Sequence, residues 1–170
     1  SPVNNDSNLY LAHMKELKDE KAKSVRKEGN PKTILKANNN LHEVEYHMPF
    51  QTHAAMEPLN CVVDVQDNYC EIWVGTQNAK NAIDRAHEIT GIDKKNIKLN
   101  ITFLGGGFGR KSFNDWIDEG LLISQKIKKP TKLIWLREDD TRHGFYRPSS
   151  LHHMIGSVKD KKINLWKHKV

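Results

Sequence analysis

Apolar positions recur along the chain with two different periods, and the changes of period separate helices from strands. A spacing of three to four residues predicts helices over residues 8–27, 79–90 and 115–128. Alternation or a short apolar run predicts strands over residues 41–48, 61–65, 71–76, 96–103, 132–136, 151–158 and 162–170. Because helices, strands and hairpins are intermixed, the fold class is expected to be α+β, with a mixed β-sheet and packed helices.

Less regular segments join these elements. Residues 33–35 are expected to form a short strand or turn, and residues 137–142 a charged turn or short helix. Residues 143–148 are expected to form a loop, and the mostly apolar strand at 132–136 is expected to be buried in the sheet. We expect one division of the chain, between a helical N-terminal segment over residues 1–40 and a main domain over 41–170.

Two turns predict β-hairpins. Asp67-Asn68 separates the strands at 61–65 and 71–76, and residues 159–161 separate the two strands nearest the C-terminus. Cys61 and Cys70 flank the first turn but are offset in the hairpin, so a disulfide between them is not expected. Two cysteines are also too few for a zinc site on their own.

A glycine-rich loop follows the strand at 96–103 and precedes the helix at 115–128. It contains Gly105, Gly106, Gly107, Phe108 and Gly109, and two cations follow directly. Glycine lets backbone N–H groups approach a ligand closely because no Cβ stands in the way. The loop therefore indicates a site for an anionic or polar ligand, and the alternative is a tight strand-to-helix connection without a ligand.

Two residues near this loop have open alternatives. Gln77 follows another strand, and if the two strands are neighbours, Gln77 and the loop lie at the same edge of the sheet. Gln77 could instead only cap the helix that follows it. Arg110 could reach a phosphate or a neighbouring acid, or lie exposed at the surface. A nucleotide-binding P-loop is disfavoured, because Gly109-Arg110-Lys111-Ser112 lacks the preceding spacing of that motif.

Composition excludes several classes. The net charge is +6, from 27 Lys and Arg against 21 Asp and Glu, but the cations are interspersed with acids, so no nucleic-acid partner is expected. No apolar run is long enough to span a bilayer. The nine histidines are scattered without metal-ligand spacing, so no protein-held metal is expected. The first residues show no signal-peptide pattern and no initiator Met, so we expect an internal piece of a longer protein.

Three segments together resemble the molybdopterin-binding large subunit of the xanthine dehydrogenase/aldehyde oxidase family. They are residues 53–60 (HAAMEPLN), residues 71–77 (EIWVGTQ) and residues 105–111 (GGGFGRK). A fourth segment, WLREDD at 135–140 with Tyr146-Arg147-Pro148, follows at the family's spacing. The resemblance covers about residues 44–170 and is strongest to the branch of the isoquinoline 1-oxidoreductase beta subunits, also called the membrane-bound aldehyde dehydrogenase type.

The resemblance implies a molybdopterin cofactor, as the cytosine dinucleotide in this branch, and hydroxylation of an aldehyde or N-heterocycle with water as the oxygen source. It implies that Gln77 hydrogen-bonds an oxo ligand of molybdenum, and that Gly107, Phe108 and Gly109 form the loop against the metal centre and the pterin. The cofactor-binding set expected on this basis is Gln77, Gly106, Gly107, Phe108, Gly109 and Arg110. The implied partners are the remainder of the large subunit and an iron–sulfur small subunit, and the implied location is periplasmic or membrane-associated.

Two departures from the family pattern limit the expected activity. Ser112 stands where relatives that hydroxylate purines have a glutamate, which argues against purine recognition. The family's catalytic glutamate lies in a later segment, so no catalytic residue is expected in these 170 residues. The isolated chain is therefore expected to be inactive and to lack the cofactor. The alternative for the whole protein is a non-catalytic binding or assembly module that shares the fold.

Overall fold

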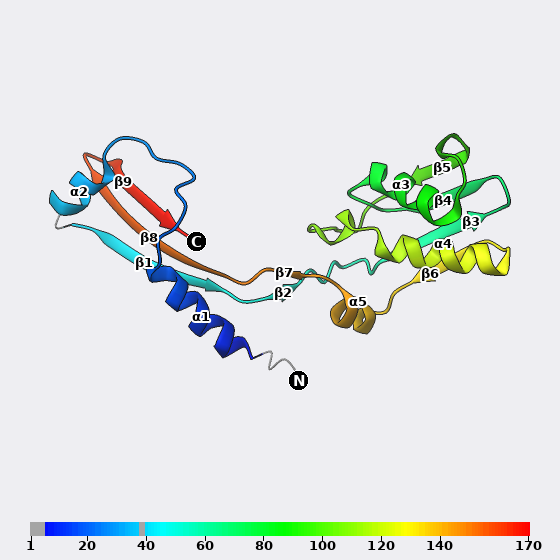
Figure 1. The fold of residues 1–170 in the computed structure, drawn as a ribbon, viewed down its shortest axis with the longest axis horizontal. Helices are drawn as coiled ribbons and strands as arrows, with labels where there is room; N and C mark the ends of the chain where they lie inside the picture. Colours follow the sequence, from blue (N-terminus) through cyan, green and yellow to red (C-terminus); the bar gives the residue numbers. More distant parts are fainter. Residues whose placement is uncertain (1–5, 38–39) are drawn as a thin grey trace. The chain divides into compact units, whose positions relative to one another are not determined.

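The computed structural model describes residues 6–37 and 40–170, and the chain forms two compact units (Figure 1). One unit contains residues 52–147. The other joins the segment up to residue 51 with residues 148–170. The predicted boundary between residues 1–40 and 41–170 is not tested by this division and stays a prediction.

The unit at 52–147 is built on a four-stranded mixed sheet with the strand order β5-β4-β3-β6. Its strands are β3 (Asn60–Val65), β4 (Cys70–Val74), β5 (Ile97–Ile101) and β6 (Thr131–Ile134). β3 is antiparallel to β4 and to β6, which confirms the predicted hairpin, and β4 is parallel to β5.

Helices connect the strands of this sheet. Helix α3 (Ala79–Thr90) links the parallel strands β4 and β5, and helix α4 (Asp115–Ile127) precedes β6. The short helices are η1 (Lys94–Asn96), η2 (Arg110–Ser112) and α5 (Arg137–His143). Asn78 caps α3 through its side chain, which accepts a hydrogen bond from the backbone N–H of Asn81. Gly91 ends α3 in the left-handed conformation, as the sequence predicts.

The core lies on one face of this sheet. Alternate side chains of β3 and β4 are buried, as the period of two requires. They pack in one cluster with buried side chains of α3 and α4: Ala82, Ala86, Trp116, Ile117 and Leu121. Cys61 and Cys70 belong to this cluster and are free thiols, opposite Val74 and Val65 respectively, so the predicted offset is confirmed. Burial raises the pKa of each thiol to about 12, so both are neutral core side chains.

Helix α4 offers a matched test of this core. The side chain of Leu121 is 0% exposed and that of its neighbour Leu122 is 56% exposed. We expect Leu121→Ala to lower the free energy of unfolding by about 2–5 kcal/mol, because it removes buried methyl groups and leaves a cavity. Leu122→Ala should change it by less than about 0.5 kcal/mol. Equal losses in urea denaturation of the two variants would contradict this assignment of the core.

The other unit holds a three-stranded antiparallel sheet with the order β1-β8-β9. Its elements are α1 (Ser7–Asp19), α2 (Pro31–Ala37), β1 (His42–Met48), β8 (Ser150–Lys159) and β9 (Lys162–Lys169). Asp160 and Lys161 turn the predicted β8–β9 hairpin with positive φ angles. Two short strands, β2 (Gln51–Thr52) and β7 (Tyr146–Arg147), pair with each other. No helix of the described residues has the length and hydrophobicity that crossing a membrane requires.

Four predictions of local structure were wrong. The first helix ends at Asp19 rather than at residue 27, because the charged segment that follows offers few apolar side chains to bury. Residues 33–35 lie in helix α2, which begins at Pro31, a residue suited to the first helical turn. Strand β6 is an edge strand with half-exposed side chains, not a buried one. The expected loop at 143–148 contains the short strand β7.

Candidate functional site

Gln77 and the glycine-rich loop, Gly105–Gly109, lie at the same edge of the sheet. Gln77 follows β4, the loop follows β5, and these strands are parallel neighbours, as the prediction required. Ligands bind in α/β sheets at such carboxyl ends of parallel strands. The structure therefore brings the two sequence features together in one place.

The side chain of Gln77 is held in one orientation by the loop. Its Oε1 accepts a hydrogen bond from the backbone N–H of Gly109 at 2.9 Å, and its own backbone N–H donates to the carbonyl of Lys111 at 2.9 Å. An amide that accepts through oxygen still offers two N–H donors. Within the described part of the chain, Gln77 Nε2 has no hydrogen-bond partner, and the side chain is exposed. Gln77 is thus an oriented donor rather than only a helix cap.

Gly107 makes this arrangement possible. A Cβ at Gly107 would lie 2.4 Å from Gln77 Oε1 and 2.6 Å from Gln77 Cδ, far inside van der Waals contact. Only glycine leaves room for the amide to lie against the backbone here. The close approach explains why the loop needs glycine at this position.

The tip of the loop has an unusual backbone. Phe108 has a φ of 51°, and Gly106 and Gly109 of the same loop have φ angles of 96° and 95°. An aromatic residue rarely adopts positive φ, and such strain is common at ligand sites. The ring of Phe108 is 59% exposed, so it is not a core aromatic. An exposed aromatic beside an oriented amide donor fits a ligand-facing loop.

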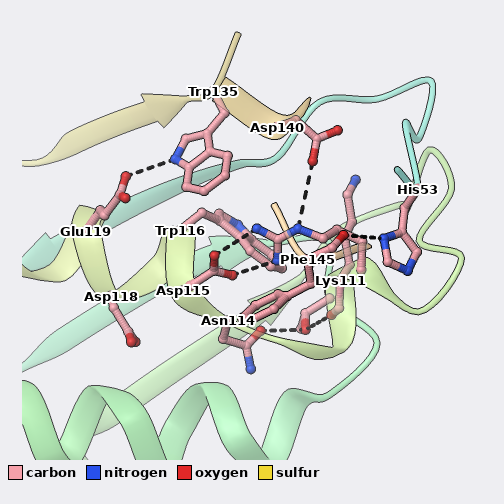
Figure 2. A network of polar contacts seen from close by, with 12 residues as sticks. His53, Lys111, Asn114, Asp115, Trp116, Asp118, Glu119, Trp135, Asp140 and Phe145 are labelled. Carbon is pink, nitrogen blue, oxygen red and sulfur yellow. Dashed lines mark hydrogen bonds and ion pairs between the residues drawn. The ribbon is translucent and has the colours of Figure 1, made fainter. Parts of the chain in front are cut away.

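Arg110 lies inside the protein and not at its surface, with 1% of its area exposed. Its Nη1 and Nη2 donate to the two carboxylate oxygens of Asp115, each at 2.7 Å, and its Nε is 3.8 Å from Asp140 Oδ1 (Figure 2). Three aromatic rings surround the guanidinium, with centroids at 5.3–5.8 Å: Trp116, Trp135 and Phe145. Of the alternatives from the sequence, the structure therefore shows the neighbouring acid as the partner of Arg110.

Further polar contacts join the Gln77 turn to the end of the loop. The carbonyl of Lys111 accepts from Thr76 Oγ1 at 3.0 Å as well as from the Gln77 N–H. Buried Asn114 accepts from Thr76 Oγ1 at 2.9 Å and donates to the Asn78 carbonyl at 3.2 Å and to Asn81 Oδ1 at 2.8 Å. The two loops consequently behave as one hydrogen-bonded unit.

Several residues of this network were missed at the level of sequence. Asn114 precedes the predicted helix and Asp115 begins it, which indicates a cap and first turn rather than a network. Asp140 lies in a charged run and gave no signal of burial, yet it is buried and paired with Arg137, whose Nη1 donates to Asp140 Oδ2 at 2.9 Å. Among residues 6–37 and 40–170, no group of three or more His, Cys, Asp or Glu side chains is placed to hold a metal ion.

Comparison with known proteins gives a consistent family. A family model described as a molybdopterin cofactor-binding domain matches residues 13–170. The chain is 32% identical over 120 residues to isoquinoline 1-oxidoreductase subunit beta from Brevundimonas diminuta, covering 69% of this chain and 15% of that protein. It is 30% identical over 108 residues to the membrane-bound aldehyde dehydrogenase [pyrroloquinoline-quinone] of Gluconacetobacter polyoxogenes, covering 63% of this chain and 14% of that protein.

The fold has relatives among solved structures. The crystal structure of quinoline 2-oxidoreductase from Pseudomonas putida 86 matches with a TM-score of 0.67 at 16% identity, over 80% of this chain and 18% of that one. The aldehyde oxidoreductase from Desulfovibrio gigas matches with a TM-score of 0.63 at 15% identity, over 77% of this chain and 15% of that one. The predicted α+β fold class is confirmed. In each of these four comparisons the chain spans less than a fifth of its relative's length.

Proposed function

This chain belongs to the molybdopterin cofactor-binding domain family, and from that premise we propose that it forms one wall of a molybdenum-cofactor site in a larger hydroxylase subunit. The single observation that carries the proposal is the pairing of Gln77 with the glycine-rich loop. Gly109 fixes the amide of Gln77, and Gly107 leaves the space that the amide occupies.

The residues present fit such a cofactor. A pterin and a metal centre with oxygen ligands require hydrogen-bond donors on a rigid backbone that comes close. Gln77 offers its unused Nε2 donors, and Gly106, Gly107 and Gly109 present backbone without side chains. When bound, the cofactor supplies the redox chemistry by which a substrate carbon is hydroxylated with water as the oxygen source.

The residues of the expected cofactor-binding set have different proposed roles. Gln77 donates a hydrogen bond to the cofactor, the backbone of Gly106–Gly109 lies against it, and the exposed ring of Phe108 keeps water away. Buried Arg110 contributes through its two bonds to partly exposed Asp115, which anchor the end of the loop. No residue of this set is assigned a catalytic proton transfer, and the isolated chain is proposed to be inactive.

The names of the relatives support the substrate class. Isoquinoline 1-oxidoreductase and aldehyde oxidoreductase name an N-heteroaromatic and an aldehyde, so we propose one of these two classes as the substrate. The cytosine dinucleotide form of the cofactor and an iron–sulfur partner subunit remain part of the proposal from family resemblance. A membrane-associated or periplasmic location is proposed on the same ground, and the name of the membrane-bound relative supports it.

The proposal is tested with the protein purified from the cells that make it. We expect it to oxidise an aromatic aldehyde or isoquinoline with a dye as electron acceptor, and to lose this activity when the cells grow on tungstate in place of molybdate. The isolated 170-residue chain should show no turnover. Turnover by the isolated chain would contradict its proposed inactivity, and activity that does not depend on molybdenum would contradict the cofactor. If the purified protein oxidised neither substrate and contained no molybdenum, the alternative of a non-catalytic module would be favoured.

A further inference from the structure

One carboxylate outside the expected set joins both ends of the glycine-rich loop. Glu57 Oε2 accepts a hydrogen bond from the backbone N–H of Gly105 at 2.9 Å and forms an ion pair with Lys111 Nζ at 2.5 Å. Gly105 begins the loop, and Lys111 follows it directly after Arg110. A single oxygen atom therefore binds the two positions between which Gly106–Gly109 are presented.

The contact with Gly105 is close and reciprocal. The backbone N–H of Glu57 donates to the carbonyl of Gly105 at 3.2 Å, so the two residues exchange hydrogen bonds. A Cβ at Gly105 would lie 2.5 Å from Glu57 Cβ. Glycine is thus required at the beginning of the loop for this approach.

Lys111 carries the effect of Glu57 to Gln77. Its side chain is 1% exposed, and Glu57 is the acid with which its ammonium pairs. A buried ammonium requires an anionic partner, because burial without one costs several kcal/mol. The carbonyl of the same residue accepts the backbone N–H of Gln77. The contacts run from Glu57 through Lys111 to Gln77, and from Gln77 Oε1 back to Gly109.

We propose that Glu57 is a positioning residue: its carboxylate clamps both ends of the glycine-rich loop and so sets the geometry of Gln77 and Gly109. For its consequence at the cofactor, this inference rests on the proposed function. For the geometry of the loop, it stands on the contacts alone.

The carboxyl group of Glu57 is ionised at neutral pH. Partial burial by itself would raise the pKa of Glu57, but hydrogen bonds from Lys111, Gly105 and Asn60 outweigh it and hold the pKa below its ordinary value. Lys111 is the charged group that faces the carboxylate. Because the folded-state pKa is lowered, the stabilisation is complete above the unfolded-state pKa and is lost as the pH falls through the folded-state value.

The first experiment follows amide NMR signals of the cofactor-free 170-residue chain. We expect the Gly105 and Gly109 amide shifts to titrate together, with a midpoint below the ordinary glutamate value of 4.5. Both transitions should vanish in Glu57→Gln. They should persist in Glu71→Gln, which breaks an ion pair of similar length, 2.7 Å, between Glu71 on β4 and the more exposed Lys98 on β5. A Cβ at Gly109 would lie 3.8 Å from His53 Nε2, so the same measurement in a His53→Gln background controls for this neighbouring side chain.

The second experiment needs no acidic pH. At pH 7 we expect the Gly105 and Gly109 amides to exchange with solvent about tenfold faster in Glu57→Gln than in the wild type, and at the wild-type rate in Glu71→Gln. The double variant Glu57→Gln/Lys111→Met removes the buried ammonium together with its partner, so it serves if the single variant does not fold. It should keep the faster exchange at Gly109, because the Lys111 anchor is gone.

Two results would overturn the positioning role. One is a wild-type exchange rate at Gly109 in both Glu57→Gln and Glu57→Gln/Lys111→Met, and the other is a Gly109 amide shift that does not change across the acid titration. These outcomes do not depend on the cofactor, so they are separate from a failure of the proposed function. In the protein purified from its own cells, Glu57→Gln should also lower the molybdenum content about tenfold, and Glu71→Gln should not. If the loop amides exchanged faster but the molybdenum content were unchanged, Glu57 would position the loop without affecting the cofactor, which would contradict its role at the cofactor.

Discussion

Gly107→Ala is expected to lower the molybdenum content of the protein purified from its own cells by more than about tenfold, which corresponds to about 1.4 kcal/mol of binding free energy. The added methyl group would lie 2.4 Å from Gln77 Oε1 and 2.6 Å from Gln77 Cδ. The side chain of Gln77 must therefore leave its place, and its hydrogen bond from Gly109 is lost with it. The free energy of unfolding should change by less than about 1 kcal/mol, because the φ of Gly107 is not in the left-handed region and a flexible side chain can move aside.

The matched control is Gly156→Ala on strand β8. A Cβ there would lie 3.6 Å from the nearest atom, the carbonyl oxygen of Leu165, which is an ordinary contact. This variant should bind molybdenum as the wild type does. A Gly107→Ala protein with wild-type molybdenum content would show that the Gln77 amide does not hold the cofactor.

The second large effect is expected at Arg110. Arg110→Met keeps much of the side-chain volume but removes the charge that pairs with Asp115 and lies near buried Asp140. Removing the buried guanidinium takes two charge-assisted hydrogen bonds from Asp115, whose side chain is 35% exposed, and one of two neighbouring cations from buried Asp140, so we expect a loss of about 3 kcal/mol in the free energy of unfolding. Arg110→Lys should not restore the loss, because an ammonium cannot make the two parallel bonds to Asp115.

Arg85→Met is the control for this measurement. Arg85 pairs with Asp118 at 2.6 Å, but its side chain is 40% exposed, and such pairs contribute less than about 1 kcal/mol. Urea denaturation followed by circular dichroism gives both values under the same conditions. If Arg110→Met lost no more stability than Arg85→Met, the buried network around Arg110 would not be an anchor of the loop.

Local sequence patterns predicted those parts of the fold that depend on local physics. Helix α3 has a capping asparagine, an apolar stripe and a terminal glycine, and it begins and ends at the expected residues. The β3–β4 and β8–β9 hairpins follow from turns between alternating segments. The position of β6 at the sheet edge depends on the pairing order of strands, and no local pattern encodes that order.

The same distinction between local and long-range features applies to the candidate site. Gln77 and the glycine-rich loop stand at the ends of predicted strands, so their proximity followed from the parallel pairing of β4 and β5. The contact between Glu57 and Lys111 joins residues 54 positions apart, and burial of Asp140 depends on the packing of α5. A single sequence shows the residue types but not these long-range contacts. The cofactor-binding roles of the six expected residues are still predictions.

An experimental structure of the molybdenum-loaded protein tests the central claim most directly. The account predicts a molybdopterin cofactor within hydrogen-bond distance of Gln77 Nε2 and against the backbone of Gly106–Gly109. It also predicts that the bonds from Gly109 to Gln77 Oε1 and from Lys111 to Glu57 are retained. A cofactor bound away from Gln77, with another part of the protein packed on the glycine-rich loop, would contradict the account.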